Sequence, residues 1–200
     1  VDVLDPSETC TAAWFQERAT AAVAKVGAGG RRPVYVGGTG LYHRAVVDGL
    51  SIPPEFPAVR ARLEAEVDAG GDPAAMHERL AAVDPVAAAR IEPGNVRRTV
   101  RALEVVEGSG QPFSSFGPGL TDYPATPVRL VGLRVGRAEL GPRISRRVDQ
   151  MVADGFVGEV EALLARPRPL SRTAAAALGY RELAEHLRGA ATLADAIAET

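Results

Sequence analysis

A glycine-rich turn between a short apolar run and a helical pattern constrains the fold of this chain most strongly. The run is Pro-Val-Tyr-Val at residues 33–36, and continuous apolar runs of this kind are typical of buried strands in parallel sheets. Residues 37–40 (Gly-Gly-Thr-Gly) follow at once, and we expect a helix over residues 41–47. Apolar residues at helical spacing predict another helix that ends near Gly27. The order helix, strand, glycine turn and helix predicts an α/β fold.

The next part of the chain has a different pattern, because no strand separates its helical segments. Residues 51–57 hold three prolines and are typical of a crossover, and four helices are expected after them. Residues 128–135 are rich in Val and Leu and alternate, which predicts a strand of the same sheet. We therefore expect residues 1–50 and 127–200 to form parts of an α/β core domain with a parallel sheet. An all-helical insertion is expected at residues 51–126.

The composition excludes several kinds of site. The 200 residues include one cysteine, Cys10, which excludes a disulfide framework and a cysteine-based zinc site. The three scattered histidines argue against a histidine-built metal site, so we predict no metal ligands in this chain. The formal net charge of −2 excludes a uniformly basic nucleic-acid binder, although a local basic patch is still possible.

Lysine is almost absent from the chain. Of the 23 basic residues only Lys25 is a lysine, and it lies inside a predicted helix. A phosphate loop of the type G-x-x-x-x-G-K-[ST] needs a lysine directly after a glycine, so no such loop exists in these 200 residues. No apolar stretch approaches the roughly 18 residues of a membrane span, and the first residues do not form a signal peptide. We therefore expect an internal piece of a longer, cytoplasmic chain that does not contact a membrane.

The glycine turn is the first candidate site, because ligands of open α/β sheets bind where the strands end. Glycines let the backbone approach a ligand, and free amides at the start of a helix favour anions. Thr39 adds a hydroxyl that can donate to a phosphate or to a base. The same residues also fit a tight turn in which Thr39 caps the helix, and the spacing leaves both interpretations open.

An arginine-rich face on the helix expected over residues 95–108 is the second candidate. The apolar side chains of this helix share one face, and Arg97, Arg98 and Arg101 fall together on the opposite face. Three arginines with no acid between them fit a phosphate-contacting patch. They also fit an ordinary solvated face, and the sequence does not decide between the two.

Two further arginines are candidates with an ordinary structural alternative. Arg60 is followed four residues later by Glu64, so a surface ion pair is the default expectation. Arg181 follows a glycine and a tyrosine at the start of a helical segment. Its guanidinium could reach an anion, or it could pair with Glu182 or Glu185.

Short segments in a fixed order extend over nearly the whole chain. They are Leu4-Asp5-Pro6, residues 36–42 (Val-Gly-Gly-Thr-Gly-Leu-Tyr), residues 84–91 (Asp-Pro-Val-Ala-Ala-Ala-Arg-Ile), residues 95–105 around Arg-Ala-Leu-Glu-Val, Arg143-Ile144 with Arg147 and Met151, Gly155-Phe156 with Glu159-Val160, and residues 178–182 (Leu-Gly-Tyr-Arg-Glu). Taken together, these segments resemble the tRNA dimethylallyltransferase family (tRNA isopentenyltransferases).

The resemblance implies a P-loop NTPase-like parallel sheet core with a helical insertion. It also implies transfer of a dimethylallyl group from dimethylallyl diphosphate to the exocyclic amine of the adenine 3′-adjacent to the anticodon. That adenine must be flipped out of the anticodon stem-loop of the tRNA to react. Mg2+ is the implied cofactor, and together with cationic groups it would stabilise the departing diphosphate. The family expectation is a cytoplasmic monomer.

The resemblance also assigns roles to residues of this chain. Thr39 is expected to contact the tRNA near the reacting base, Arg60 to contact the tRNA, and Arg181 to bind the diphosphate. The segment that grips tRNA corresponds to Arg97, Arg98, Thr99, Val100 and Arg101. The family's phosphate loop and the segment that supplies its general base have no counterpart here. We therefore expect these 200 residues alone to be inactive, with at most weak, salt-sensitive tRNA binding.

Three other functions are compatible with parts of the pattern. A small-molecule kinase with a helical lid would have a similar sheet and insertion, but it gives no reason for the arginine face. A non-catalytic RNA-binding module predicts that the complete gene carries no phosphate loop. An adenine-nucleotide isopentenyltransferase would use the same chemistry on free nucleotides, and the tRNA-gripping segment argues against it.

Overall fold

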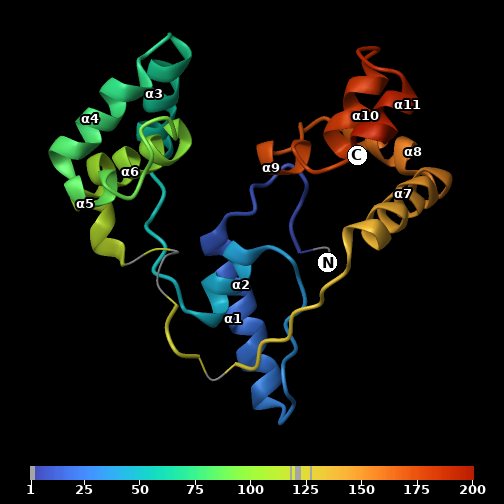
Figure 1. The fold of residues 1–200 in the computed structure, drawn as a ribbon, viewed down its shortest axis with the longest axis horizontal. Helices are drawn as coiled ribbons and strands as arrows, with labels where there is room; N and C mark the ends of the chain where they lie inside the picture. The colour runs from blue at the N-terminus through green and yellow to red at the C-terminus, as the bar shows by residue number, and fades with distance from the viewer. Residues whose placement is uncertain (1–2, 118, 120–122, 127) are drawn as a thin grey trace. The chain divides into compact units, whose positions relative to one another are not determined.

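Helices are the only regular secondary structure in the computed structural model, which describes residues 3–117, 119, 123–126 and 128–200 (Figure 1). These residues form two compact units, and each unit has a hydrophobic core of its own. The units are Ala12–Val128 on the one hand, and Val1–Thr11 together with Arg129–Thr200 on the other. The separate insertion domain expected at residues 51–126 stays a prediction.

The predicted parallel sheet is absent from the described residues, so the expected α/β, P-loop NTPase-like fold class is wrong for this chain. Residues 33–36 and 128–135 have no regular structure, and the side chains that should be buried are exposed: Val36 is 90% exposed and Leu133 is 93% exposed. A strand exists only where a neighbouring strand bonds its N–H and C=O groups. An apolar run reports a tendency to be buried, and it does not report whether such a partner is present.

The first two helices of the unit Ala12–Val128 pack against each other. They are α1 (Ala12–Ala28) and α2 (Gly40–Val47), and both were expected from the sequence. The rings of Phe15 and Tyr42 stack between them with their centroids 4.4 Å apart. Helix α2 begins at Gly40, so the glycine-rich segment at residues 37–40 leads directly into a helix, as predicted.

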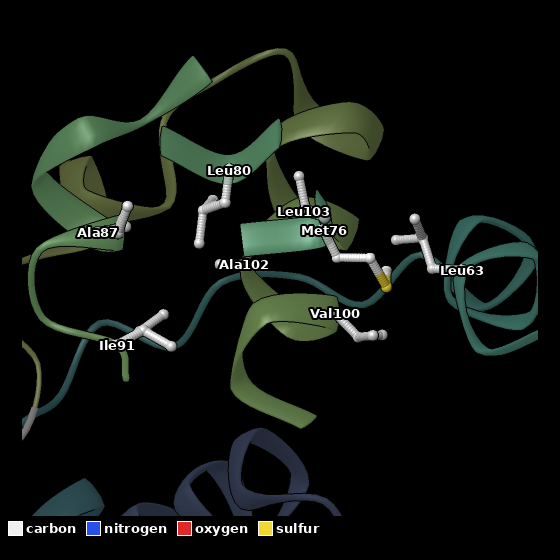
Figure 2. Close-up of a cluster of buried hydrophobic side chains, with 9 residues drawn as sticks. Leu63, Met76, Leu80, Ala87, Ile91, Val100, Ala102 and Leu103 are labelled. Atoms are coloured by element: carbon white, nitrogen blue, oxygen red, sulfur yellow. The ribbon is translucent and has the colours of Figure 1, made fainter. Parts of the chain in front are cut away.

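The four helices expected after residue 57 are confirmed, and they pack around one core. They are α3 (Pro57–Asp68), α4 (Pro73–Val83), α5 (Pro85–Ala88) and α6 (Val96–Ser109), followed by the 3-10 helix η1 (Phe113–Phe116). We call these elements the helical cluster. Figure 2 shows its apolar side chains converging from different helices, among them Leu63, Met76, Leu80 and Leu103. The centre of this core comes from α6, in which Leu103 is fully buried.

Proline and short polar caps determine where these helices begin. Each of α3, α4 and α5 begins with a proline, whose fixed φ suits the first turn and whose missing N–H is not needed there. The Asp84 side chain accepts from the Ala87 N–H at 3.0 Å at the start of α5. The Asn95 side chain accepts from the Arg98 N–H at 3.2 Å and caps α6.

Helix α6 approaches the start of α3 closely at one glycine. A Cβ atom built on Gly108 would lie 2.1 Å from Cγ of the Phe56 ring. No other residue leaves room for that ring, so Gly108 sets how closely these two elements pack.

The second unit contains five helices among its described residues. They are α7 (Arg137–Ala153), α8 (Phe156–Leu164), α9 (Arg172–Ala175), α10 (Tyr180–Leu187) and α11 (Leu193–Glu199). Its core side chains are contributed by α8, α10 and α11: Phe156, Val160, Leu183, Ala184 and Ala196.

The first residues of the chain are bound to this second unit. The Arg166 guanidinium donates to the Asp5 carboxylate at 2.6 Å, and the Ser171 N–H donates to the Pro6 carbonyl at 2.8 Å. The hydroxyl and N–H of Ser7 also donate to Asp5, and together with Arg166 they hold the pKa of that carboxyl well below its usual range. These bonds join two segments that lie far apart in the sequence.

No helix within the described part of the chain combines the length and the apolar character that crossing a bilayer needs.

Candidate nucleic-acid interface

The start of α6 presents two arginines to solvent. Arg97 and Arg98 occupy the first turn after the Asn95 cap, and both side chains are exposed. Within the described residues neither guanidinium forms an ion pair. An unpaired guanidinium offers a planar set of donors that fits the oxygens of a phosphate. These two side chains are therefore the most accessible cations of the predicted tRNA-gripping segment.

The next two residues of that segment face the interior. Thr99 is fully buried, and its hydroxyl donates to the Asn95 carbonyl at 3.2 Å. Val100 is 5% exposed and belongs to the core of the helical cluster. Their side chains pack on the inner side of α6, so only the arginines of this segment can form its surface.

Arg101 is directed toward the protein. Its Nη1 lies 2.8 Å from Oε1 of Glu104, and its Nη2 donates to the carbonyls of Pro53 at 2.8 Å and Pro54 at 3.3 Å. The side chain is 23% exposed. Arg101 therefore connects α6 to the segment that leads into α3. Unlike Arg97 and Arg98, it is engaged by an ion pair and by hydrogen bonds.

Arg60 on α3 meets the same carboxylate. Its Nε donates to Oε2 of Glu104 at 2.8 Å, and its Nη2 lies 3.9 Å from Glu55. The Phe56 N–H donates to Oε1 of Glu104 at 2.7 Å. Glu104, whose side chain is completely buried, thus joins Arg60, Arg101 and the start of α3.

The Glu104 carboxylate is ionised in spite of its burial. Burial alone raises the pKa of a carboxyl group, because the charged form loses its hydration. The Phe56 N–H and the guanidinium groups of Arg101 and Arg60 more than offset this, and they hold the pKa of Glu104 below its usual range. The interior of the helical cluster therefore contains a charge that is stable only together with its partners.

A second set of ion pairs lies one turn further along α6. Glu107 pairs with Arg62 of α3 and with Arg79 of α4, and Arg62 also lies 2.6 Å from Glu66. Arg62 and Glu66 lie four residues apart on α3, a spacing at which helical side chains meet. These groups are more exposed than Glu104, so their pairing is screened by solvent.

Thr39 stands at the N-cap position of α2. Its backbone is extended, with φ −84° and ψ 98°, but its hydroxyl makes no capping hydrogen bond. The residue is exposed. The Thr39 hydroxyl is therefore available to a ligand, as the first interpretation of the sequence requires. The second interpretation, in which Thr39 caps α2, lacks the hydrogen bond that defines a cap.

Arg181 lies on α10, in the other compact unit. Its Nε donates to Oε1 of Glu182 at 2.9 Å, which is one of the two pairings expected from the sequence. Glu182 is buried, and its other oxygen accepts from the Gly179 N–H at 2.8 Å. Burial raises the pKa of Glu182, but its own N–H, Arg181 and the Gly179 N–H more than offset this and lower that pKa. The Arg181 side chain is still 63% exposed.

The structure thus divides the predicted residues into three groups. Arg60 and Arg101 meet on Glu104, which the sequence reasoning did not single out. Arg97 and Arg98 are free at the start of α6, and Thr39 and Arg181 lie elsewhere. The signal that points to Glu104 is its position three residues after Arg101, a spacing at which helical side chains meet.

Comparison with known proteins identifies the family. A model of the IPP transferase family matches residues 1–200. The chain belongs to the IPP transferase family. A tRNA dimethylallyltransferase of a Nocardioides species is 50% identical over 98% of this chain, and the one of Salinispora tropica is 46% identical over all of it.

Solved structures of the family agree with this assignment. The full-length tRNA isopentenylpyrophosphate transferase of Bacillus halodurans is 37% identical, with a TM-score of 0.59 over 100% of this chain and 61% of that one. The corresponding transferase of Staphylococcus epidermidis is 27% identical, with a TM-score of 0.58 over 99% of this chain and 64% of that one. The chain covers 63% and 62% of the length of the Nocardioides and Salinispora relatives.

Proposed function

We propose that the protein containing this chain transfers a dimethylallyl group from dimethylallyl diphosphate to an adenine of tRNA. The observation that carries the proposal is the match of the IPP transferase family over residues 1–200, together with relatives at 46–50% identity that are named tRNA dimethylallyltransferase. The reacting atom is the exocyclic amine of the adenine 3′-adjacent to the anticodon, and the anticodon stem-loop is the RNA partner.

The reaction exchanges one bond to the allylic carbon for another. The amine nitrogen of the adenine forms a bond to that carbon, and the bond from the carbon to the diphosphate oxygen breaks. The electron pair leaves with the diphosphate, and a carboxylate accepts the proton of the amine. Cations placed around the leaving group lower the barrier, since negative charge grows there in the transition state. We assign the base to no residue of this chain.

In this chain we assign the RNA contacts to the arginines that are accessible. Arg97 and Arg98 bind backbone phosphates from the first turn of α6, and Arg60 adds a contact from α3. Thr39 lies near the flipped adenine, where its exposed hydroxyl donates to the base or to a phosphate. Thr99, Val100 and Arg101 contribute indirectly, because their side chains hold α6 in place.

Arg181 is the residue we assign to the diphosphate. Glu182 holds both Nε and Nη2 of Arg181, and the side chain is still 63% exposed, so Nη1 is the terminal nitrogen left to meet an anion. A cation at this place would stabilise the charge that develops on the departing group.

Mg2+ is the cofactor that the family implies. The described residues contain no group of three or more His, Cys, Asp or Glu side chains that could hold a metal ion. We therefore assign Mg2+ to no residue of this chain, and we derive no step through the metal. A monomeric state and a cytoplasmic location also stay predictions.

The activity is tested with the protein in its full natural length. It is incubated with unmodified tRNA and dimethylallyl diphosphate, and the tRNA is digested and analysed by mass spectrometry. We expect a dimethylallyl group on the adenine next to the anticodon. Parallel reactions with AMP as acceptor and with ATP as phosphate donor separate the two alternative enzymes. Modification of AMP alone, or phosphate transfer to a small molecule without tRNA modification, would contradict the proposal.

The RNA contacts are tested with the double variant Arg97→Ala/Arg98→Ala. We expect tRNA affinity to fall on the order of tenfold or more at low salt, and the slope of log affinity against log salt to decrease by about 2, one for each lost phosphate contact. Arg62→Ala is the matched control, because its guanidinium is already engaged by Glu66 and Glu107. An unchanged salt slope in the double variant would refute the phosphate contacts.

A further inference from the structure

Glu104 is a fully buried charged residue in the helical cluster, and a contribution to stability does not by itself explain why a charge lies there. Removing a carboxylate from water is costly, and an apolar residue of similar volume is often as stabilising as a buried ion pair. A charge retained at such a position has a second role in proteins where it fixes the geometry of its partners. Glu104 has three partners, and two of them are arginines that reach the surface.

The contacts of Glu104 use different parts of the two arginines. Arg60 donates to Glu104 through Nε, and its side chain is 34% exposed. Its terminal Nη2 lies 3.9 Å from the exposed Glu55 carboxylate, beyond hydrogen-bond distance, so the terminal nitrogens can still donate to a ligand. Arg101 is more deeply engaged, since Nη1 meets Glu104 and Nη2 meets the carbonyls of Pro53 and Pro54. Arg60 thus offers an outer edge of donors, whereas Arg101 offers almost none.

A free arginine on a helix surface samples many rotamers, and a phosphate contact must overcome that freedom. Holding Nε on a buried carboxylate removes most of the freedom before the ligand arrives. The two terminal nitrogens that remain form a pair of parallel donors, which matches two oxygens of a phosphate. The Phe56 N–H fixes the carboxylate from the α3 side, and Arg101 fixes it from the α6 side.

We propose that Glu104 is a positioning residue that orients the outer edge of Arg60 toward an RNA phosphate, with Arg101 as its structural support. The proposal rests on the function proposed above, because the phosphate belongs to the tRNA substrate. Glu104 itself does not touch the RNA. Its effect on binding passes entirely through Arg60.

The sign of a single charge change tests this role. Glu104→Gln keeps the shape of the side chain and an oxygen for the Phe56 N–H, but it removes one negative charge. Without a positioning role, that change makes the surface more positive and strengthens tRNA binding. With a positioning role, Arg60 loses its fixed orientation, and we expect affinity to fall on the order of threefold to tenfold.

Glu107→Gln is the matched control for charge. Glu107 lies on the same helix, three residues further on, and it pairs with Arg62 and Arg79 instead of Arg60. The substitution removes the same charge, so we expect unchanged or slightly tighter tRNA binding. A fall in affinity of equal size for both variants would overturn the positioning role.

A double-mutant cycle separates positioning from stability. If Glu104 acts through Arg60, then the double variant Arg60→Ala/Glu104→Gln binds tRNA no more weakly than Arg60→Ala alone. Additive losses would mean that Glu104 acts through the fold and would overturn the proposal. Circular dichroism and thermal melting confirm that the compared variants are folded.

The variant Arg60→Lys tests the proposal independently, even if Glu104→Gln does not fold. Lysine retains the charge, but its single ammonium cannot bind Glu104 and present a second pair of donors. We expect Arg60→Lys to bind tRNA as weakly as Arg60→Ala does, while Arg62→Lys binds like the wild type. Wild-type affinity of Arg60→Lys would overturn the proposal. All assays use the protein in its full natural length, and dimethylallyl transfer by the wild type reports separately whether the proposed function holds.

Discussion

Both compact units contain a buried glutamate that holds an arginine, and they differ in how far its contacts extend along the sequence. Glu104 binds Phe56 and Arg60, which lie 48 and 44 residues away. Glu182 binds Arg181 and the Gly179 N–H, which lie one and three residues away. The first carboxylate joins two helices, whereas the second completes the start of one helix. The same residue type therefore serves tertiary structure in one unit and local structure in the other.

Removing each carboxylate should give the largest difference between the two units. We expect Glu104→Ala to lower the free energy of unfolding by about 2–4 kcal/mol, since it leaves two partly buried arginines and a backbone N–H without their acceptor. Glu182→Ala should cost about 1–2 kcal/mol, as expected for the loss of a helix cap. Native-state hydrogen exchange of the amides in α3, α6 and α10 measures each loss in its own unit. Equal losses would mean that the range of the contacts has no energetic consequence.

Substitution of one glycine in each unit should change stability by a smaller amount and in opposite directions. Gly108→Ala should destabilise the helical cluster by about 1–3 kcal/mol, because its Cβ would overlap the Phe56 ring. Gly158→Ala in α8 meets nothing within 4 Å. It should stabilise the other unit by about 0.5–1 kcal/mol, because alanine restricts the unfolded chain. Denaturant titration of both variants checks the two signs, and a stabilising Gly108→Ala would show that Phe56 moves aside without cost.

Acid should affect stability least, and in a direction set by the lowered pKa of Glu104. The folded pKa lies below the usual value of 4.5, so the unfolded chain binds its proton first as the pH falls. The stabilisation by the ionised carboxylate is complete above about pH 4.5 and is lost as the pH falls through the lowered pKa. We expect the difference in unfolding free energy between wild type and Glu104→Gln to shrink as the pH falls from 6 to 3. A difference that stays constant over this interval would show that folding does not lower the pKa of Glu104.

Local signals in the sequence were sufficient for the helices of the helical cluster. Proline at the first position of α3, α4 and α5, and the Asn95 side chain at the start of α6, act within one turn, so they are visible without the fold. The strands predicted at residues 33–36 and 128–135 failed for the opposite reason. A strand depends on a partner segment, and no local pattern identifies one.

The candidate site was predicted in part for the same reason. The arginines of α6 were found by their helical spacing, but the spacing placed Arg101 with Arg97 and Arg98. Its actual partners include the Pro53 and Pro54 carbonyls, which lie 48 and 47 residues away. Glu104 was missed because a charged residue is normally assigned to solvent, and its burial becomes reasonable only once Arg60 is brought to it from another helix.

The ion pair between Asp5 and Arg166 determines which of the two units can complete its folding first during synthesis. The two residues are 161 positions apart, and the whole unit Ala12–Val128 is synthesised between them. Synthesis proceeds from the N-terminus, and domains fold as units during it. The unit Ala12–Val128 is therefore complete and able to fold while Asp5 still has no partner. The unit that holds the first residues of the chain is the last to close.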